Sequence, residues 1–308
     1  MPQDVLQLCH RIADDLAGDG ARAVVLVGSY ARDAATPESD VDLVVIGSGP
    51  GYQLSIREGR LISLSWHTEE QQRERFRWPR AAVTEIPGWR SGVIIRDSDG
   101  IGAALQREAI GWSWDQVTGP ACRWVAAELT GYAEEVHKLV AALRYRRPRM
   151  AAVQRNLLVL HLPMVLAVHY ETLHDSENEV WDAIADRAGE HWRSTQDRAL
   201  SLDRQSLDDS CRAALEMYAE AVTIAGHLFD DRQRSVVAQA VALARDTLEA
   251  GSVQGVTSQD AGHHDGTPEQ DIAAHQPEYR QPGQPRRQPG GQDEGGDDGD
   301  ESHGRQVV

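Results

Sequence analysis

Residues 23–46 read AVVLVGSYARDAATPESDVDLVVI, and this stretch decides which fold the chain can adopt. An apolar run typical of a buried strand ends at Gly28-Ser29, a polar loop follows, and a second apolar run begins with Asp40-Val-Asp42. Because residues i and i+2 of a strand point to the same side, the carboxylates of Asp40 and Asp42 are predicted to aim at one spot. Two oxygen ligands at one spot suit Mg²⁺ that carries a nucleotide phosphate.

The residues around the polar loop suit a triphosphate. Gly28 has no Cβ, so the backbone can pass close to a phosphate group. Ser29 offers a hydroxyl and an amide at the start of a helical turn, where anions bind well, and Arg32 can reach a phosphate oxygen. Since nucleotidyl transfer needs mainly alignment and charge neutralisation, the stretch predicts a nucleotide site with two metal ions held by Asp40 and Asp42.

Strand and helix patterns alternate through the first part of the chain. Apolar residues at helical spacing predict an amphipathic helix over residues 5–16. Shorter apolar runs predict further strands at residues 61–66 and 93–96. These patterns together predict an α/β domain over residues 1–115.

From about residue 120 the apolar spacing becomes helical throughout. It predicts a long helix over residues 124–143 and four further helices, so we expect an all-α helical bundle over residues 120–250. Residues 251–308 contain eleven Asp or Glu against four Arg and few large apolar side chains. Such a segment cannot bury enough surface to offset its ordering entropy, and it is predicted to form a disordered acidic tail.

The whole chain of 308 residues has a formal net charge of −17. An acidic balance argues against a protein that follows a nucleic-acid backbone over an extended surface. The sequence has no uninterrupted apolar run long enough for a membrane span, so none is predicted. The N-terminus lacks the basic and apolar regions of a secretory signal, and the three cysteines lie far apart, so we expect a protein of the reducing cytoplasm.

The motif of residues 28–42 resembles the signature of the DNA polymerase β-like nucleotidyltransferase superfamily, in which Gly-Ser is followed by Asp-x-Asp. The resemblance covers about residues 20–110. It implies an α+β domain with a mixed sheet, in which the two aspartates hold Mg²⁺ while the Gly-Ser pair and Arg32 position the phosphates. It also implies transfer of a nucleoside monophosphate, AMP, from a nucleoside triphosphate, ATP, to an acceptor hydroxyl.

Two positions depart from the family pattern. Asp33 stands where the family usually has Gly, which constrains the loop and adds a carboxylate that would repel phosphate. The family commonly has a third carboxylate on the next long strand, but here Ser63 and Ser65 occupy the alternate positions. The usual metal-linked base is therefore missing or displaced.

The helical half offers a replacement for the third acid. Glu134 and Lys138 lie four residues apart in a segment that resembles the first bundle helix of kanamycin-type aminoglycoside nucleotidyltransferases. That resemblance implies Glu134 as general base and Lys138 as a triphosphate contact, with Glu128 and Glu135 as competing carboxylates. The alternative is an exposed ion pair that contributes ~0.3–0.5 kcal/mol. Related resistance enzymes dimerise, so a homodimer is a further expectation from the resemblance.

The expected function is Mg²⁺-dependent transfer of AMP to a hydroxyl of a small molecule of the aminoglycoside type. Two alternatives stay open. One is an antitoxin-like adenylyltransferase that modifies a partner protein. The other is a nucleotide-binding regulator that has lost turnover together with its third acid.

Overall fold

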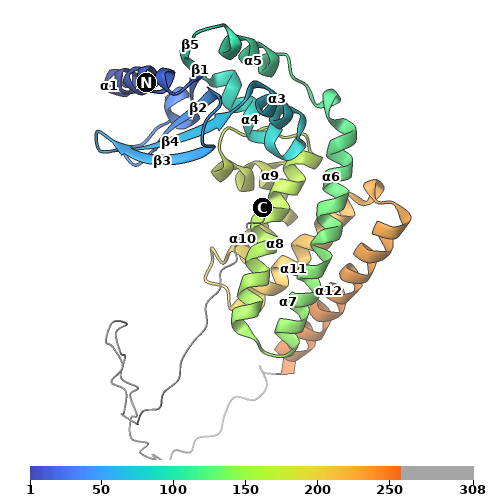
Figure 1. Cartoon of the computed structure of the whole chain (residues 1–308). Helices are drawn as coiled ribbons and strands as arrows, with labels where there is room; N and C mark the ends of the chain where they lie inside the picture. Colours follow the sequence, from blue (N-terminus) through green and yellow to red (C-terminus); the bar gives the residue numbers. More distant parts are fainter. Residues whose placement is uncertain (258–308) are drawn as a thin grey trace, which may run out of the picture. The chain divides into compact units, whose positions relative to one another are not determined.

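The structure is a computed structural model that describes residues 1–257, with side chains described up to residue 250. These residues belong to one compact unit of the chain, whose elements are labelled in Figure 1. The disordered acidic tail predicted for residues 251–308 lies outside the described residues, apart from the end of the last helix.

The strands are β1 (Ala21–Val27), β2 (Val41–Gly47), β3 (Tyr52–Arg57), β4 (Arg60–His67) and β5 (Val93–Asp97). They form one sheet in the order β3-β4-β2-β1-β5 (Figure 1). β2 and β4 run parallel, whereas the other neighbouring strands run antiparallel. The mixed sheet that the motif implies is therefore confirmed.

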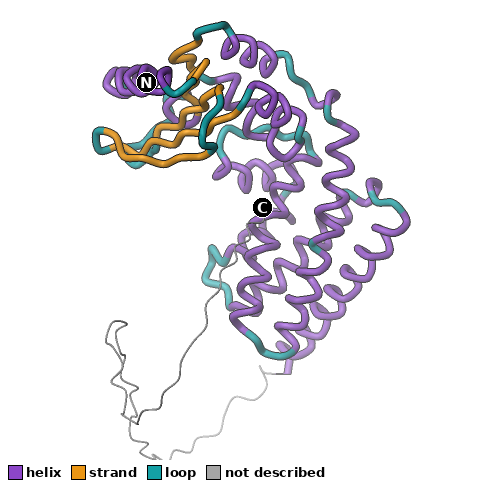
Figure 2. Tube along the Cα trace, in the orientation of Figure 1, coloured by secondary structure: helices purple, strands orange, loops and turns teal. Residues whose placement is uncertain are grey.

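The helices of this half are α1 (Gln3–Gly18), α2 (Gly28–Ala31), α3 (Glu69–Arg77), α4 (Pro79–Ser91) and α5 (Ile101–Ile110). They form layers on the sheet (Figure 2). Along β1, Val24 and Leu26 share a core with α1, whereas Ala23 and Val25 share the opposite core with α3, α4 and α5. The alternation of the strand therefore gives each face its own apolar core.

Two elements of this half are not predicted by the sequence patterns. The edge strand β3 has polar residues at alternate positions, and its turn to β4 uses Glu58 and Gly59 with φ values of 52° and 76°. Two positive φ values in succession are typical of the tight turns that close a hairpin. The second missed element is α4, which begins at Pro79 directly after the extended residue Trp78. Proline is well tolerated at a first helical position because its missing N–H has no partner there.

The second half is a helical bundle, as predicted, made of α6 (Thr118–Gly131), α7 (Ala133–Arg144), α8 (Pro148–His169), α9 (Val180–Ala188), α10 (Glu190–Leu200), α11 (Leu207–Ile224) and α12 (Asp231–Thr257). Trp192 and Tyr218 are fully buried in its core. The single long helix predicted over residues 124–143 is wrong, because the chain divides it into α6 and α7 at Tyr132. Gly131, whose helix propensity is poor, directly precedes the break.

One helix of the described chain, α8, is long and apolar enough to cross a membrane by length and composition. Half of this segment is buried inside the bundle, where Leu158, Leu162 and Leu166 belong to the core. A helix that is apolar on most sides is also what the centre of a large bundle requires. The length and composition of α8 are therefore weak evidence for a membrane span.

Replacing Tyr218 with phenylalanine is expected to lower the free energy of unfolding by about 1–2 kcal/mol. The buried hydroxyl of Tyr218 donates a hydrogen bond of 2.9 Å to the carbonyl oxygen of Leu129 on α6, and phenylalanine cannot make this bond. Urea denaturation measures the difference. The control is Tyr145→Phe, which removes a hydroxyl from a tyrosine that is 65% exposed. An equal decrease in the free energy of unfolding in the two variants would contradict the prediction.

Candidate active site

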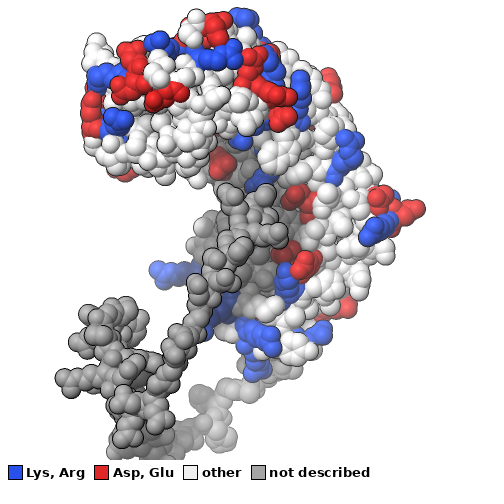
Figure 3. Space-filling view, viewed as in Figure 1, with Lys and Arg blue, Asp and Glu red and all other residues white. Residues whose placement is uncertain are grey.

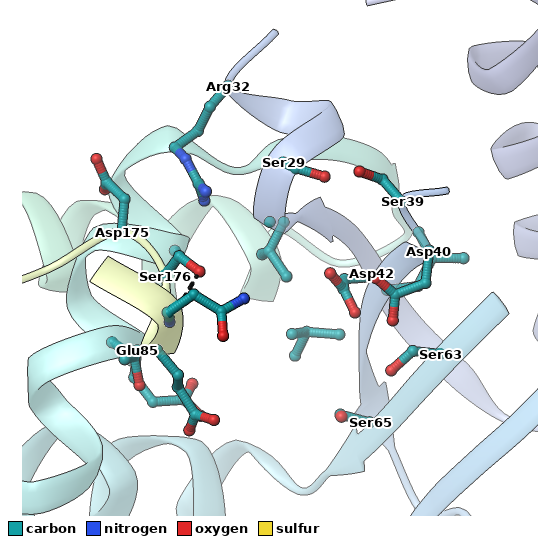
Figure 4. A pocket seen from close by; sticks show the side chains of 18 of the residues that line it. Ser29, Arg32, Ser39, Asp40, Asp42, Ser63, Ser65, Glu85, Asp175 and Ser176 are labelled. Carbon is teal, nitrogen blue, oxygen red and sulfur yellow. Dashed lines mark hydrogen bonds between the residues drawn. The ribbon is translucent and has the colours of Figure 1, made fainter. Parts of the chain in front are cut away.

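A pocket of about 650 Å³ lies where the two apolar strands of the motif end (Figure 4). Its walls come from β1, β2, β4, α4, the polar loop of the motif and the loop that follows α8. The residues predicted at the motif all line it: Gly28, Ser29, Arg32, Asp40 and Asp42. The fold thus gathers around one space the side chains for which the sequence predicts phosphate and metal contacts.

The two aspartates face the same part of the pocket (Figure 4). Asp42 lies inside the sheet, between Val27 of β1 and Ser63 of β4. Burial, and then the negative charge of Asp40, raise the pKa of Asp42 to about 6, although Ser63 and Arg32 act in the opposite direction. A cation placed between the two carboxylates would relieve their repulsion.

Gly28 is required at this site for two reasons. Its φ of +71° lies in the left-handed region, which a residue without a Cβ adopts readily. A methyl group at this position would also overlap a carboxylate oxygen of Asp42. The close approach of the β1–α2 turn to Asp42 therefore depends on glycine.

Arg32 follows the short helix α2 and lines the same pocket. Its Nη1 is buried and has no hydrogen-bond partner among the described residues. A buried guanidinium nitrogen without a partner is costly, and a phosphate oxygen would satisfy it. This arrangement fits a nucleotide phosphate held between Arg32 and the turn at Ser29.

The departure at Asp33 does not add a carboxylate to the pocket. Asp33 has a φ of 56°, the conformation that favours the glycine of the family pattern. Its exposed carboxylate pairs with the N-terminal amine of Met1 and is absent from the pocket lining. The expected repulsion of phosphate by Asp33 therefore has no support in the geometry.

The donor set at the pocket fits Mg²⁺ that arrives with a nucleotide. Mg²⁺ is often held by one or two carboxylates, with phosphate oxygens and water completing its ligands. Asp40 and Asp42 supply such a pair. Within the described residues, no group of three or more His, Cys, Asp or Glu side chains is placed to hold a metal. The two aspartates would therefore depend on the nucleotide to complete the coordination.

Ser63 and Ser65 line the pocket from β4, where the family commonly has its third acid. Four other carboxylates line the pocket. Glu38 comes from the motif loop itself, whereas Glu85 comes from α4, and Asp175 and Glu177 come from the loop after α8. No spacing or local motif connects the last three with the motif, because only tertiary packing places them there.

Glu85 is held in place rather than free to act as a base. Its carboxylate accepts hydrogen bonds of 3.0 Å from Gln72 and 2.6 Å from Arg75. The neighbouring His67 also lines the pocket, and burial followed by the charge of Arg75 lowers its pKa. The loop after α8 is fastened beside these groups, since the backbone N–H of His174 donates to the carbonyl of Val83 on α4.

Glu134 and Lys138 lie on α7 and are absent from the pocket lining. They form an ion pair of 2.7 Å, and Glu135 is 3.4 Å from the same ammonium group. The side chain of Glu134 is 71% exposed, and its hydrogen bond with Lys138 lowers its pKa, which weakens it as a base. The structure does not bring the pair to the aspartates of the same chain, so the roles predicted for it stay predictions.

Replacing Arg32 with glutamine is expected to weaken Mg-ATP binding by roughly 10–100-fold, because one charge-assisted hydrogen bond to phosphate contributes about 1.5–3 kcal/mol. Calorimetry with Mg-ATP and with AMP measures the effect, and the loss should be larger for the triphosphate. The control is Arg245→Gln, which removes an exposed arginine from α12. Unchanged Mg-ATP affinity in the Arg32 variant would exclude Arg32 from the phosphate site.

The match to one protein family agrees with this site. Residues 10–99 match the family model described as a nucleotidyltransferase domain. A crystal structure of a nucleotidyltransferase-like protein from Exiguobacterium sibiricum 255-15 is similar at 14% sequence identity and a TM-score of 0.46, covering 81% of this chain and 92% of that chain. No curated protein matches the chain significantly. Residues 10–99 thus match a nucleotidyltransferase domain, the kind of domain that the motif of residues 28–42 predicts.

Proposed function

We propose that the protein transfers AMP from ATP to a hydroxyl group of an acceptor in a Mg²⁺-dependent reaction. The observation that carries this proposal is the convergence of two carboxylates and one arginine on one pocket. Asp40 and Asp42 face the same space as Arg32, whose buried Nη1 has no hydrogen-bond partner within the described part of the chain. A negatively charged ligand that brings its own cation would pair with Arg32 and place the cation beside the two carboxylates.

Different residues of the pocket would bind the phosphates and the cation. Arg32 and the turn at Gly28-Ser29 bind and orient the phosphates, and Asp40 and Asp42 hold the cation. Mg²⁺, when bound, neutralises phosphate charge and makes an approaching hydroxyl easier to deprotonate. Alignment of the acceptor hydroxyl with the α-phosphorus supplies most of the remaining rate enhancement.

The acceptor should carry a positive group close to its hydroxyl. The pocket is lined by one arginine against six carboxylates, of which four are not needed for the metal: Glu38, Glu85, Asp175 and Glu177. Glu85 is already paired with Arg75, whereas the other three carboxylates have no ion pair with any residue that the structure describes and can attract a cationic acceptor. Aminoglycosides have this chemistry, and so does a polypeptide with a basic residue beside a hydroxyl.

The test uses purified protein, Mg²⁺ and ATP labelled at the α-phosphate, with a panel of aminoglycosides as acceptors. The proposal predicts labelled acceptor and release of pyrophosphate in equal amounts. Calorimetry measures Mg-ATP affinity in the same samples. Mg-ATP binding without pyrophosphate release for any acceptor, of whatever class, would support the alternative of a nucleotide-binding regulator.

The Glu134→Gln variant separates the two interpretations of the α7 pair. A general base at Glu134 requires turnover to fall by about 10²–10⁴-fold. Because Glu134 is exposed and lies outside the pocket lining, we expect a change below about threefold, as for an exposed ion pair. The control is Glu135→Gln on the same helix, which removes the second partner of Lys138. A loss confined to Glu134→Gln would restore its role as base.

A further inference from the structure

The edge strand β3 exposes a row of large apolar side chains. Tyr52, Leu54 and Ile56 alternate with polar residues and are exposed by 63%, 55% and 67%, and Leu61 on the neighbouring β4 is exposed by 40%. We call these four residues the β3 strip. In an antiparallel pair the apolar side normally faces a core and the polar side faces water. A contiguous exposed row of this kind marks an interaction surface.

The register of the sheet places the β3 strip on the same face as the two aspartates. Leu54 pairs with Ser63, and Ser63 pairs with Asp42, so one row of side chains crosses the sheet from the strip to the pocket. Ile56 pairs with Leu61 in the next row on this face. Directly paired residues point to the same side of a sheet. The strip therefore continues the floor of the pocket outward, and two strand spacings of about 5 Å each separate Leu54 from Asp42.

A further pocket of about 490 Å³ is lined both by residues of the strip and by residues of the motif loop. Ile56 and Leu61 line it together with Glu38 and Ser39, and the charged residues Glu58 and Arg60 line it as well. Glu38 and Ser39 also line the pocket that contains the two aspartates. In Figure 3 charged side chains gather at the turn of the β3–β4 hairpin, whereas the surface along the strands is mainly uncharged on the face in view. An acceptor whose hydroxyl lies at the aspartates would thus have a continuous path to the β3 strip.

The shape of the strip favours a polypeptide over a small molecule. β3 is an edge strand of the sheet, and its only charged residue is Arg57. Edge strands usually carry charges or bulges that block pairing with another chain. From Tyr52 to Ile56 the strip extends over ~13 Å. An extended peptide can cover a long open row of apolar side chains, whereas small ligands are usually enclosed by a concave site.

We propose that the acceptor is a polypeptide, in which a Ser, Thr or Tyr hydroxyl lies at the two aspartates while apolar residues of the same partner cover the β3 strip. This inference rests on the proposed function. The acceptor oxygen bonds to the α-phosphorus, the bond from that phosphorus to the bridging oxygen breaks, and pyrophosphate leaves with the electron pair. The hydroxyl proton passes to a carboxylate of the pocket. Because an extended chain spans ~3.3–3.6 Å per residue, the apolar residues lie about three positions from the hydroxyl.

The test uses the full-length protein, Mg²⁺, ATP labelled at the α-phosphate, and random peptide mixtures with one fixed Ser, Thr or Tyr. We expect label on peptides, strongest in the mixtures with an apolar residue fixed about three positions from the hydroxyl. Leu54→Ser with Ile56→Ser should lower this labelling about tenfold or more, because serine buries much less apolar surface against the partner. Mg-ATP affinity should stay unchanged, since neither residue lines the nucleotide pocket.

The matched control is Val153→Ser with Leu160→Ser, two apolar residues of α8 that are exposed by 55% and 48%. The control should label peptides like the parent protein. Label on aminoglycosides but on no peptide, or equal peptide labelling by the strip variant, would overturn the inference while leaving the proposed function intact. A dimer of the parent protein that dissociates in the strip variant would assign the strip to a second copy and would also overturn it. Absence of Mg-ATP binding would remove the proposed function itself.

Discussion

The Asp42→Asn variant is expected to lose nucleotidyl transfer by about 10³-fold or more, because a metal contact supplies several kcal/mol of stabilisation to the developing phosphate charge. Asp42 is the aspartate that lies within the sheet, beside Ser63 and opposite Val27. Calorimetry should show that Mg²⁺ no longer strengthens ATP binding. The control is Asp182→Asn, an exposed aspartate on α9. If the Asp42→Asn variant binds Mg-ATP as tightly as the parent protein, Asp42 is not part of a metal site.

Although Asp42→Asn should lower activity, it should raise the stability of the nucleotide-free protein at neutral pH. The pKa of Asp42 is raised to about 6 by burial and by Asp40, so its proton is held more tightly in the folded state. Its stabilising effect is thus largest in acid and declines as the pH rises from about 4 to 6. At pH 7 the ionised Asp42 opposes folding, and asparagine should raise the Tm by about 2–4 °C, the shift that ~1 kcal/mol produces in a chain of this size.

If Asp42 holds the cation as proposed, its titration should set the pH dependence of Mg-ATP binding. Below pH 6 a proton competes with the cation for Asp42. Mg-ATP affinity of the parent protein should therefore fall by about tenfold per pH unit below that value, and it should level off above it. Calorimetry between pH 5 and pH 8 measures the profile. A midpoint near pH 4 would show that burial and Asp40 do not act on Asp42 as the structure indicates.

The Gly28→Ala variant is expected to lose about 100-fold or more in Mg-ATP affinity, with only a modest loss of stability. The positive φ of Gly28 makes alanine cost about 1–2 kcal/mol. The new methyl group would also displace the carboxylate of Asp42, which can move because it is the end of a side chain. The metal site is therefore disturbed more than the fold. Calorimetry and thermal unfolding measure the two effects separately.

Gly100→Ala is the matched control for this prediction. Gly100 has a φ of +81°, and a Cβ built there meets no atom within 4 Å. The two variants therefore share the backbone strain, and only the variant at Gly28 disturbs Asp42. We expect similar losses of stability and a loss of nucleotide affinity at Gly28 alone. Equal affinities in the two variants would mean that the contact with Asp42 has no role in nucleotide binding.

Local patterns predict the centre of the fold well. The strands on both sides of the motif and the helix over residues 5–16 follow from apolar periodicity, which needs only neighbouring residues. β3 is missed because its apolar side chains are exposed and its polar residues alternate with them. α4 is missed because Pro79 is a helix-breaking residue except at the first turn, where the structure places it.

Local sequence is enough to predict the part of the site at which phosphate and metal contacts are expected. Gly28, Asp40 and Asp42 come together through one turn and one strand alternation, and both are local properties of the chain. The surroundings of these residues depend on tertiary packing. Carboxylates from α4 and from the loop after α8 line the pocket, whereas Glu134 lies outside its lining. The exposure of the apolar face of β3 also follows from tertiary structure, because it depends on the order and register of the strands in the sheet. These relations are set by contacts between residues far apart in the chain, on which periodicity and spacing carry no information.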